Sequence, residues 1–177
     1  FGNHAYHNHD ASCRTTKTFQ PVEEALATQS MNTVMNGTYR VIEFPAESPA
    51  HGSHVLIDDP ADPVASPFGW HDVDGSAGAE YTNTRGNNVY AYPDLNADGA
   101  PDQLIDGGTD LVFDFPLLPN DEPDLHIPAS TTNLFYSNNI MHDIFYQYGF
   151  DEDAGNFQEN NYGNGGPGGA GDGVNAR

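Results

Sequence analysis

The stretch LFYSNNIMHDIFYQYGF, residues 134–150, is the most regularly patterned part of the chain. At about 100° per residue, four large apolar side chains fall on one face of a helix: Leu134, Met141, Phe145 and Tyr148. Gly149 can end this helix as the C′ residue. Three possible N-cap residues precede it, Ser130, Thr131 and Thr132. We therefore predict one long scaffold helix near residues 131–148.

This helix carries a histidine beside an aspartate, His142 and Asp143. Adjacent positions on a helix do not face each other, so we do not expect the two side chains to form a joint site. A zinc pair on a helix needs spacing i, i+4, and those positions around His142 are Asn138 and Tyr146. We expect His142 to bond to a neighbouring segment or to stand in the outer shell of a site. Asp143 is expected to be a solvated or loop-pinning carboxylate.

The region before the helix is rich in short β-patterned segments. Alternation and β-branched or aromatic residues predict strands over residues 38–44, 54–58, 79–84 and 88–92, with a further one within residues 109–117. A turn at residues 85–87 joins the third and fourth of these. The expected fold class is α+β, with a β-rich segment followed by one long helix.

The chain has 177 residues and a formal net charge of −21, from 26 acidic against 5 basic residues. This balance argues against nucleic acid and anionic membrane partners, because both are bound through Lys and Arg. A salt-tolerant extracellular surface, calcium loops and attraction of cationic substrates all remain open. No apolar run is long enough for a transmembrane helix. A single cysteine, Cys13, excludes an intrachain disulfide.

Residues 1–36 are expected to be a linker with one short helix opening near Pro21. The first thirteen residues collect side chains that can ligate a transition metal: His4, His7, His9, Asp10 and Cys13. Their spacing matches no closed zinc site with a second ligand pair downstream. We therefore favour adventitious metal binding, or a plain linker, over a structural metal site in these residues.

Residues 94–102, DLNADGAPD, match the first half of a calcium loop. Asp94, Asn96 and Asp98 are spaced two apart, and Asp102 stands at the ninth position. The acid expected at the twelfth position is absent, because Ile105 occupies it. Calcium ligation and a plain Asp-Gly turn both remain open.

No complete catalytic constellation is visible in the chain. His51 and His54 are expected on the surface, and His71 and Asp72 in a loop beside an aromatic anchor. Neither the G-x-S-x-G motif of serine hydrolases nor a phosphate-binding loop occurs.

Four blocks of the chain resemble one family of secreted zinc metalloendopeptidases. They read S-P-F-x-W at residues 66–70, T-x-T-R-G-N-N at 82–88, L-F-Y-x-x-N-x-x-H-D-x-x-Y-x-x-G-F at 134–150, and A-G-N-F at 154–157. In this order they resemble the fungalysin family (peptidase family M36), its bacterial members more than its fungal ones. The resemblance covers roughly residues 38–169.

The resemblance implies a thermolysin-like, two-lobed fold with zinc between the lobes. The family's zinc ligands are an H-E-x-x-H motif and a later glutamate, and the zinc-activated water hydrolyses peptide bonds of protein or peptide substrates. The chain contains no H-E-x-x-H, so no catalytic residue and no zinc ligand is expected in it. Residues 37–177 would be the N-terminal part of the peptidase domain, and residues 1–36 would lie near the junction with the propeptide of the zymogen.

Under this interpretation, the apolar helix face should pack partly on elements of the parent protein outside this chain. The competing hypothesis is a non-catalytic, acidic extracellular binding module stabilised by calcium at residues 94–102.

Overall fold

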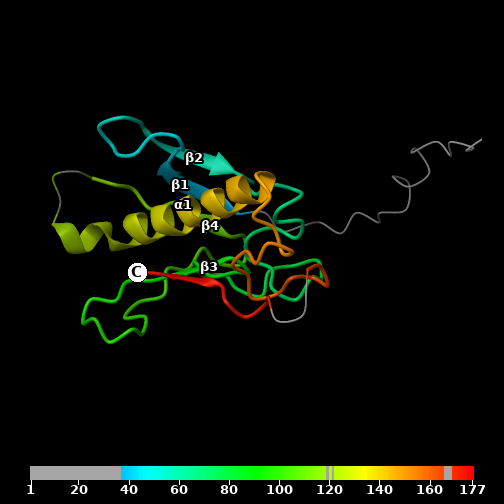
Figure 1. Cartoon of the computed structure of the whole chain (residues 1–177). Helices are drawn as coiled ribbons and strands as arrows, with labels where there is room; N and C mark the ends of the chain where they lie inside the picture. The colour runs from blue at the N-terminus through cyan, green and yellow to red at the C-terminus, as the bar shows by residue number, and fades with distance from the viewer. Residues whose placement is uncertain (1–36, 119, 121, 166–168) are drawn as a thin grey trace, which may run out of the picture. The chain divides into compact units, whose positions relative to one another are not determined.

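A computed structural model describes residues 37–118, 120, 122–165 and 169–177 (Figure 1). The metal-ligating tract and the short helix predicted within residues 1–36 lie outside the described residues. In the described part, the helix α1 (Ile127–Gln147) lies between two small sheets and contacts β1 on one side and β3 and β5 on the other (Figure 1).

The first sheet has the strand order β2–β1–β4. β1 (Thr38–Ile42) pairs antiparallel with β2 (His54–Asp58), and β4 (Val112–Phe113) pairs parallel with the other edge of β1. Both longer strands were predicted, although β1 ends two residues early. The reason is a turn closed by Ala46, whose N–H donates to the carbonyl of Glu43 ahead of a proline-rich loop.

The second sheet pairs β3 (Val89–Ala91) with β5 (Val174–Ala176) in parallel. The strand predicted over residues 88–92 is confirmed at its centre, but the predicted partner over residues 79–84 is wrong. That segment contributes only one isolated bridge, between Asn83 and Asp106. The turn between them is packed under Trp70: a Cβ at Gly86 would lie 1.5 Å from the Trp70 carbonyl oxygen. Only the end of the segment and the adjoining Arg85 still pair with β3, through the Arg85–Tyr90 bridge and the bond from the Ala91 N–H to the Thr84 carbonyl, and β5 supplies the parallel partner strand.

Helix α1 begins four residues earlier than predicted. A 3₁₀ turn, η2 (Pro123–His126), leads directly into it, and a proline stands in its first turn, where the missing N–H costs nothing. Ser130, Thr131 and Thr132 therefore lie inside the helix, and the N-cap prediction for them is wrong. Gly149 ends the helix as predicted, with φ +91° and its N–H donating to the Tyr146 carbonyl.

An aromatic cluster joins the first sheet to α1. Tyr39 stacks on Phe113 with ring centroids 5.3 Å apart, and Trp70 meets Phe135 edge to face at 6.2 Å. These side chains belong to one buried core, which also holds Val41, Val89, Ala91, Ile105, Leu111, Tyr136 and Ala176. The core observed between sheet and helix confirms the α+β class.

His71 is buried inside this aromatic cluster. Its ring lies parallel to that of Phe113, with centroids 5.2 Å apart. Nδ1 lies 3.0 Å from the Arg85 carbonyl oxygen, which can only accept, so Nδ1 donates. Nε2, 2.8 Å from the Tyr39 hydroxyl, therefore accepts from it. Burial lowers the pKa of His71 to about 4.

No helix in the described part of the chain is long and apolar enough to cross a membrane.

The burial of His71 predicts a stability that falls in acid. The unfolded chain binds a proton below pH 6.5 and the folded chain does not until about pH 4. The contribution of neutral His71 to the free energy of unfolding is therefore complete above pH 6.5. It decreases as the pH falls toward 4, by roughly 3 kcal/mol in all. Urea unfolding at a series of pH values measures it.

Two variants isolate the contribution of His71. His71→Phe keeps a ring in the stack, and we expect it to lower stability at neutral pH while flattening the pH profile. His51→Gln removes an exposed histidine and should leave the profile unchanged. An equally steep profile for His71→Phe would contradict the assignment.

Candidate functional site

Helix α1 presents a polar and aromatic face to the rest of the fold. Its buried positions recur at helical spacing: Ala129, Thr131, Thr132, Phe135, Tyr136, Asn139 and Asp143. The face carrying Met141, Phe145 and Tyr148 is solvent-exposed instead, at 38%, 47% and 87%. Leu134, the remaining residue of the predicted face, is partly buried against the core, so the helix is anchored mainly, but not only, by the side that the apolar pattern did not mark.

Asp143 is the central acceptor on the buried face. Its side chain accepts hydrogen bonds from the Asp62 backbone N–H at 3.0 Å, the Ser66 hydroxyl at 2.7 Å and the Trp70 indole N–H at 2.9 Å. Asp143 is 5% exposed. This contact fixes the loop of residues 62–70 on the helix and confirms the prediction of a loop-pinning carboxylate.

His142 and Asp143 are in contact, so the premise that adjacent helical side chains do not meet is wrong here, while the prediction that they form no joint site stays a prediction. His142 Nδ1 lies 3.0 Å from Asp143 Oδ1. Adjacent Cβ atoms diverge on a helix, but both side chains turn toward the same flank and close the gap. A carboxylate only accepts, so Nδ1 carries the hydrogen. Nε2 is then left as the acceptor for the Asn156 amide at 3.4 Å.

A cleft of about 220 Å³ opens beside the exposed face of α1. His142 contributes to its wall, although its side chain is only 8% exposed. The remaining lining is largely apolar: Asn88, Val89, Asn138, Met141, Phe145, Phe150, Phe157 and Val174. An apolar cleft bordered by exposed Phe145 and Phe157 is a surface suited to packing against another structured element.

A buried amide network extends from Asp143 toward the C-terminal segment. Asn88 donates to the Ser66 hydroxyl at 3.1 Å and to Asn139 at 3.2 Å, and Gln158 donates to Asn88 at 3.5 Å. Asn139 also donates to the Phe135 carbonyl at 2.9 Å. Sequence reasoning assigned no role to these amides. The available signal was the Asn138–Asn139 pair inside a helix, where asparagine is disfavoured unless it has a partner.

The network joins all four blocks that carry the family resemblance. Ser66 and Trp70 come from the first block, Asn88 from the second, Asn139 and Asp143 from the third. Asn156, from the fourth, contacts His142. Segments far apart in sequence therefore meet around one helix.

The Asp94–Asp102 loop is held by its own backbone. Asp94 accepts from the N–H groups of Asp98 and Gly99, and Asp102 accepts from that of Leu95. Arg177 lies 3.2 Å from Asp94. Hydrogen bonds of this kind are those of a turn. The calcium assignment to Asp94, Asn96, Asp98 and Asp102 stays a prediction.

The other predicted histidine positions divide between surface and core. His51 is exposed, as expected, and its ring lies within hydrogen-bond distance of the Ser48 hydroxyl. His54 lies in β2, half-buried, and burial lowers its pKa. His71 and Asp72 follow Trp70 in a loop, as predicted, but both are 1% exposed, which the sequence did not indicate.

Asp72 is electrostatically the most unusual carboxyl in this loop. Burial raises its pKa, hydrogen bonds from Gly75 and Tyr162 lower it, and the charges of Glu80 and Asp74 raise it further. The pKa of Tyr162 is raised, first by burial and then by its hydrogen bond to Asp72.

The described residues do not fit a zinc centre. Within them, the one group of three or more His, Cys, Asp or Glu side chains close enough to share an ion consists of carboxylates only, Asp72, Asp74 and Glu80. Zinc in proteins is held mainly by nitrogen and sulfur. His71 has both ring nitrogens bonded within the protein.

Comparison with known proteins identifies relatives of this segment. The family model of the fungalysin metallopeptidases (M36) matches residues 38–177, so the similarity continues through the C-terminal segment. An extracellular metalloproteinase 5 from Trichophyton tonsurans is 44% identical over 138 residues, which are 76% of this chain and 22% of the relative.

Two further fungal proteins give the same result. Extracellular metalloproteinase 5 from Trichophyton rubrum is 43% identical over 139 residues, and extracellular metalloproteinase 1 from Arthroderma gypseum is 42% identical over 140. These cover 76% and 77% of this chain and 21% of each relative. The chain thus spans about a fifth of the length of the curated relatives it matches. The closer similarity to bacterial members stays a prediction.

The Asp143 contacts predict a large loss of stability on truncation. Asp143→Ala leaves the Trp70 indole, the Ser66 hydroxyl and the Asp62 amide without their acceptor. We expect the free energy of unfolding to fall by about 3 kcal/mol or more. Urea unfolding monitored by Trp70 fluorescence, the chain's single tryptophan, measures the change.

Asp153→Ala is the matched control, because Asp153 is exposed on the segment that follows the helix. It should change the unfolding free energy by less than about 0.5 kcal/mol. Equal effects of the two substitutions would show that Asp143 does not hold the loop.

Proposed function

The chain belongs to the fungalysin (M36) metallopeptidase family, and on this premise we propose that it is the N-terminal part of the catalytic domain of a secreted, zinc-dependent metalloendopeptidase. The observation that carries the proposal is the meeting of all four family blocks in one buried network around α1. The relatives named extracellular metalloproteinases support both the activity and the secretion of the whole protein. Its substrates would be proteins or peptides.

In this proposal the segment is a scaffold. It contains no H-E-x-x-H motif, and its described residues form no zinc centre. The residues of the network position α1 and the loop of residues 62–70 on the sheet. The parent protein's remaining part would supply the zinc ligands, complete the two-lobed fold and carry the reaction. A propeptide preceding the mature enzyme, with residues 1–36 near the junction, belongs to the same proposal.

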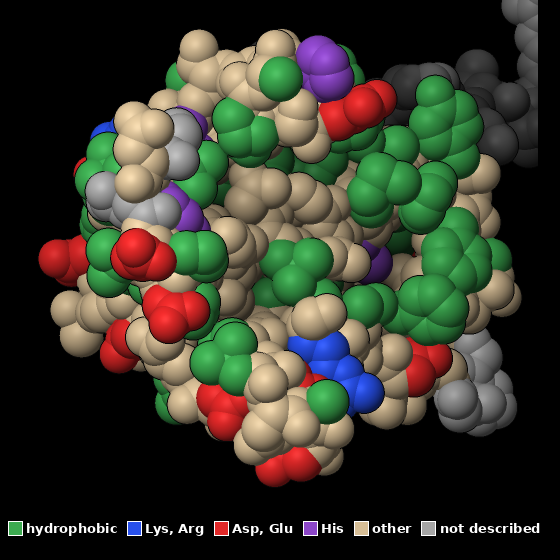
Figure 2. Space-filling model, turned by 90° about the vertical axis from the view of Figure 1, so that its left-hand side faces the viewer, with side chains coloured by type: hydrophobic (Ala, Val, Ile, Leu, Met, Phe, Trp, Pro, Cys, Tyr) green, Lys and Arg blue, Asp and Glu red, His purple; other side chains and the backbone are tan. Residues whose placement is uncertain are grey.

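The exposed face of α1 is the surface on which the zinc-bearing part would pack. Met141 and Phe145 line the cleft beside the helix, and Phe157 borders it from the C-terminal segment. Figure 2 shows hydrophobic side chains gathered in patches on one face of the described part, with acidic side chains at its margins. Such apolar area is usually covered in a stable domain. His142, in the wall of this cleft, would then brace the interface from outside the metal's ligand shell.

A non-catalytic binding module stabilised by calcium at residues 94–102 is the alternative. It would place an ion among Asp94, Asn96, Asp98 and Asp102, whose side-chain oxygens accept the hydrogen bonds of the turn. A rise in melting temperature with calcium that Asp98→Ala abolishes would favour this alternative. The two hypotheses also differ in the activity expected of the full-length protein: a peptidase hydrolyses peptide bonds, and a binding module does not.

Peptide hydrolysis by two protein lengths tests the proposal. We expect the full-length protein to cleave casein in a reaction that a zinc chelator stops and added zinc restores. The 177-residue chain alone should give no chelator-sensitive cleavage, because its sequence contains no H-E-x-x-H motif. Cleavage by the 177-residue chain, or none by the processed full-length protein, would overturn the assignment.

Phe145→Ser tests the packing of the α1 face. In the 177-residue chain Phe145 is already 47% exposed, so the substitution should change the unfolding free energy by less than about 1 kcal/mol and reduce self-association. In the full-length protein Phe145→Ser should lower the unfolding free energy by about 2–4 kcal/mol, because it removes a large apolar side chain from a packed interface.

Leu95→Ser serves as the control, since Leu95 is 70% exposed on a turn away from the cleft. It should be neutral in both proteins. The proposal fails at this point if Phe145→Ser is equally mild in the short and the full-length protein.

A further inference from the structure

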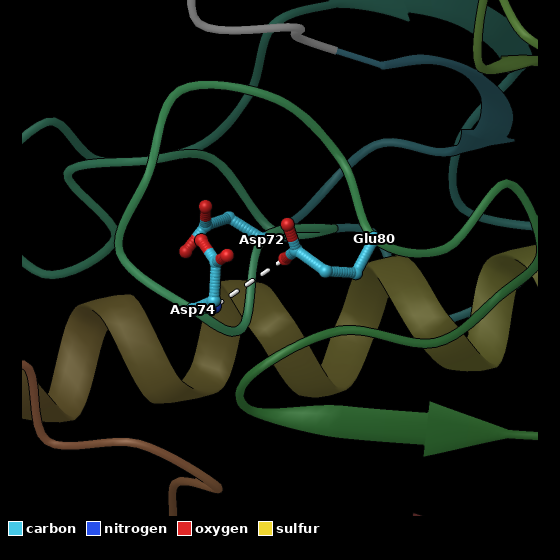
Figure 3. Close-up of side chains that lie close together, drawn as sticks. All are labelled: Asp72, Asp74 and Glu80. Atoms are coloured by element: carbon cyan, nitrogen blue, oxygen red, sulfur yellow. Dashed lines mark hydrogen bonds between the residues drawn. The ribbon is translucent and has the colours of Figure 1, made fainter.

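Three carboxylates converge in the loop that follows Trp70. One oxygen each from Asp72, Asp74 and Glu80 lies within 4.8 Å of the other two. Figure 3 shows the carboxylate of Asp72 turned toward that of Asp74, with Glu80 reaching in from the returning end of the loop. Like charges this close repel each other unless something compensates them.

Backbone N–H groups and a tyrosine hold one oxygen of each carboxylate. Asp72 Oδ1 accepts from the Gly75 N–H and the Tyr162 hydroxyl, both at 2.9 Å. Asp74 Oδ1 accepts from the Ser76 N–H at 2.7 Å. Glu80 Oε2 accepts from the N–H groups of Val73 and Asp74, the latter at 3.3 Å and drawn dashed in Figure 3. The three side chains are therefore preorganised.

The second carboxylate oxygen of Asp72, Oδ2, indicates that a ligand binds here. Asp72 is 1% exposed, and its Oδ2 is buried without a hydrogen-bond partner. A buried carboxylate oxygen that no protein group donates to is costly to fold around, and native structures seldom leave one without a partner. Its position in the carboxylate cluster makes a cation the natural partner.

The basic side chains of the described part do not compensate this charge. Arg40 pairs with Asp114, and Arg177 pairs with Asp94. The Arg85 guanidinium lies over the rings of Tyr81 and Tyr90, 4.3 Å and 4.9 Å from their centroids. No ion pair in the described residues reaches Asp72, Asp74 or Glu80.

We propose that Asp72, Asp74 and Glu80 bind a calcium ion. The donors are oxygens only, which favours a hard cation over zinc or copper. Asp74 and Glu80 are exposed, so water can complete the six to eight ligands that calcium takes. This site is separate from residues 94–102, and the inference does not depend on the proposed peptidase activity.

The ion would lock the C-terminal segment to this loop. Tyr162 donates to Asp72, and the Asn160 amide donates to the Val73 carbonyl at 2.8 Å. Phe68 packs edge-on against Tyr162 with centroids 4.9 Å apart. Neutralising the carboxylates would therefore stabilise both the loop and the segment that docks on it.

Calorimetric titration of the chelator-treated 177-residue chain with calcium chloride tests the site. We expect one saturable site, with a dissociation constant on the order of 10⁻⁴–10⁻³ M, as in extracellular calcium modules. The double variant Asp74→Asn/Glu80→Gln should weaken binding at least tenfold. It leaves the buried Asp72 intact, so circular dichroism should show an unchanged fold.

Asp98→Ala is the control for the other acidic loop and should bind calcium like the parent chain. Amide NMR shifts of the parent chain provide a readout without any variant: calcium should move the resonances of residues 73–80 and Tyr162. Absence of saturable binding, equal binding by the double variant, loss in Asp98→Ala alone, or shifts confined to residues 94–102 would each overturn the proposal.

Discussion

The architecture of this segment depends on one buried carboxylate, that of Asp143. It collects an indole N–H, a hydroxyl and a backbone N–H from the loop of residues 62–70, together with the neighbouring His142 ring. A carboxylate in an apolar core is costly unless its lone pairs are bonded, and here the bonds come from residues that must already be folded. Trp70, held by this acceptor, in turn covers Gly86 and packs on Phe135. Loop, turn and helix are thus fixed together.

Sequence patterns predicted the parts of the fold that obey local periodicity. β1, β2 and the body and C-terminus of α1 follow from alternation, helical spacing and Gly149. The pairing of β3 with β5 was not predictable, because a three-residue strand has almost no pattern and its partner is distant in sequence. The helix start was missed for a related reason: Ser130 to Thr132 are plausible caps, and only the preceding 3₁₀ turn shows that the helix is already under way.

The two acidic loops, residues 72–80 and 94–102, show that residue types alone cannot decide which carboxylates are free to bind a cation. Residues 94–102 have calcium-loop spacing, yet none of their side-chain oxygens is buried without a hydrogen-bond partner. Asp72, Asp74 and Glu80 have no such spacing, yet they converge and leave a buried oxygen without a donor. Ligand capacity depends on which lone pairs remain after folding, and that is a property of the tertiary hydrogen-bond network. The same limit applied to His142 and Asp143, where helical geometry was read from Cβ directions and the side-chain rotamers decided the contact.

The two faces of α1 separate the stability of this chain from the packing role proposed for the helix. The polar and aromatic face, through Phe135, Asn139 and Asp143, gains its bonds from residues of this chain. The apolar face, through Met141 and Phe145, gains little here, because it remains in contact with solvent. Apolar burial is non-directional and can be supplied by any complementary surface, whereas the buried hydrogen bonds accept only one arrangement. The polar network can therefore specify the position of the helix before the apolar face is covered, so that a second part of the protein would dock on a surface already formed.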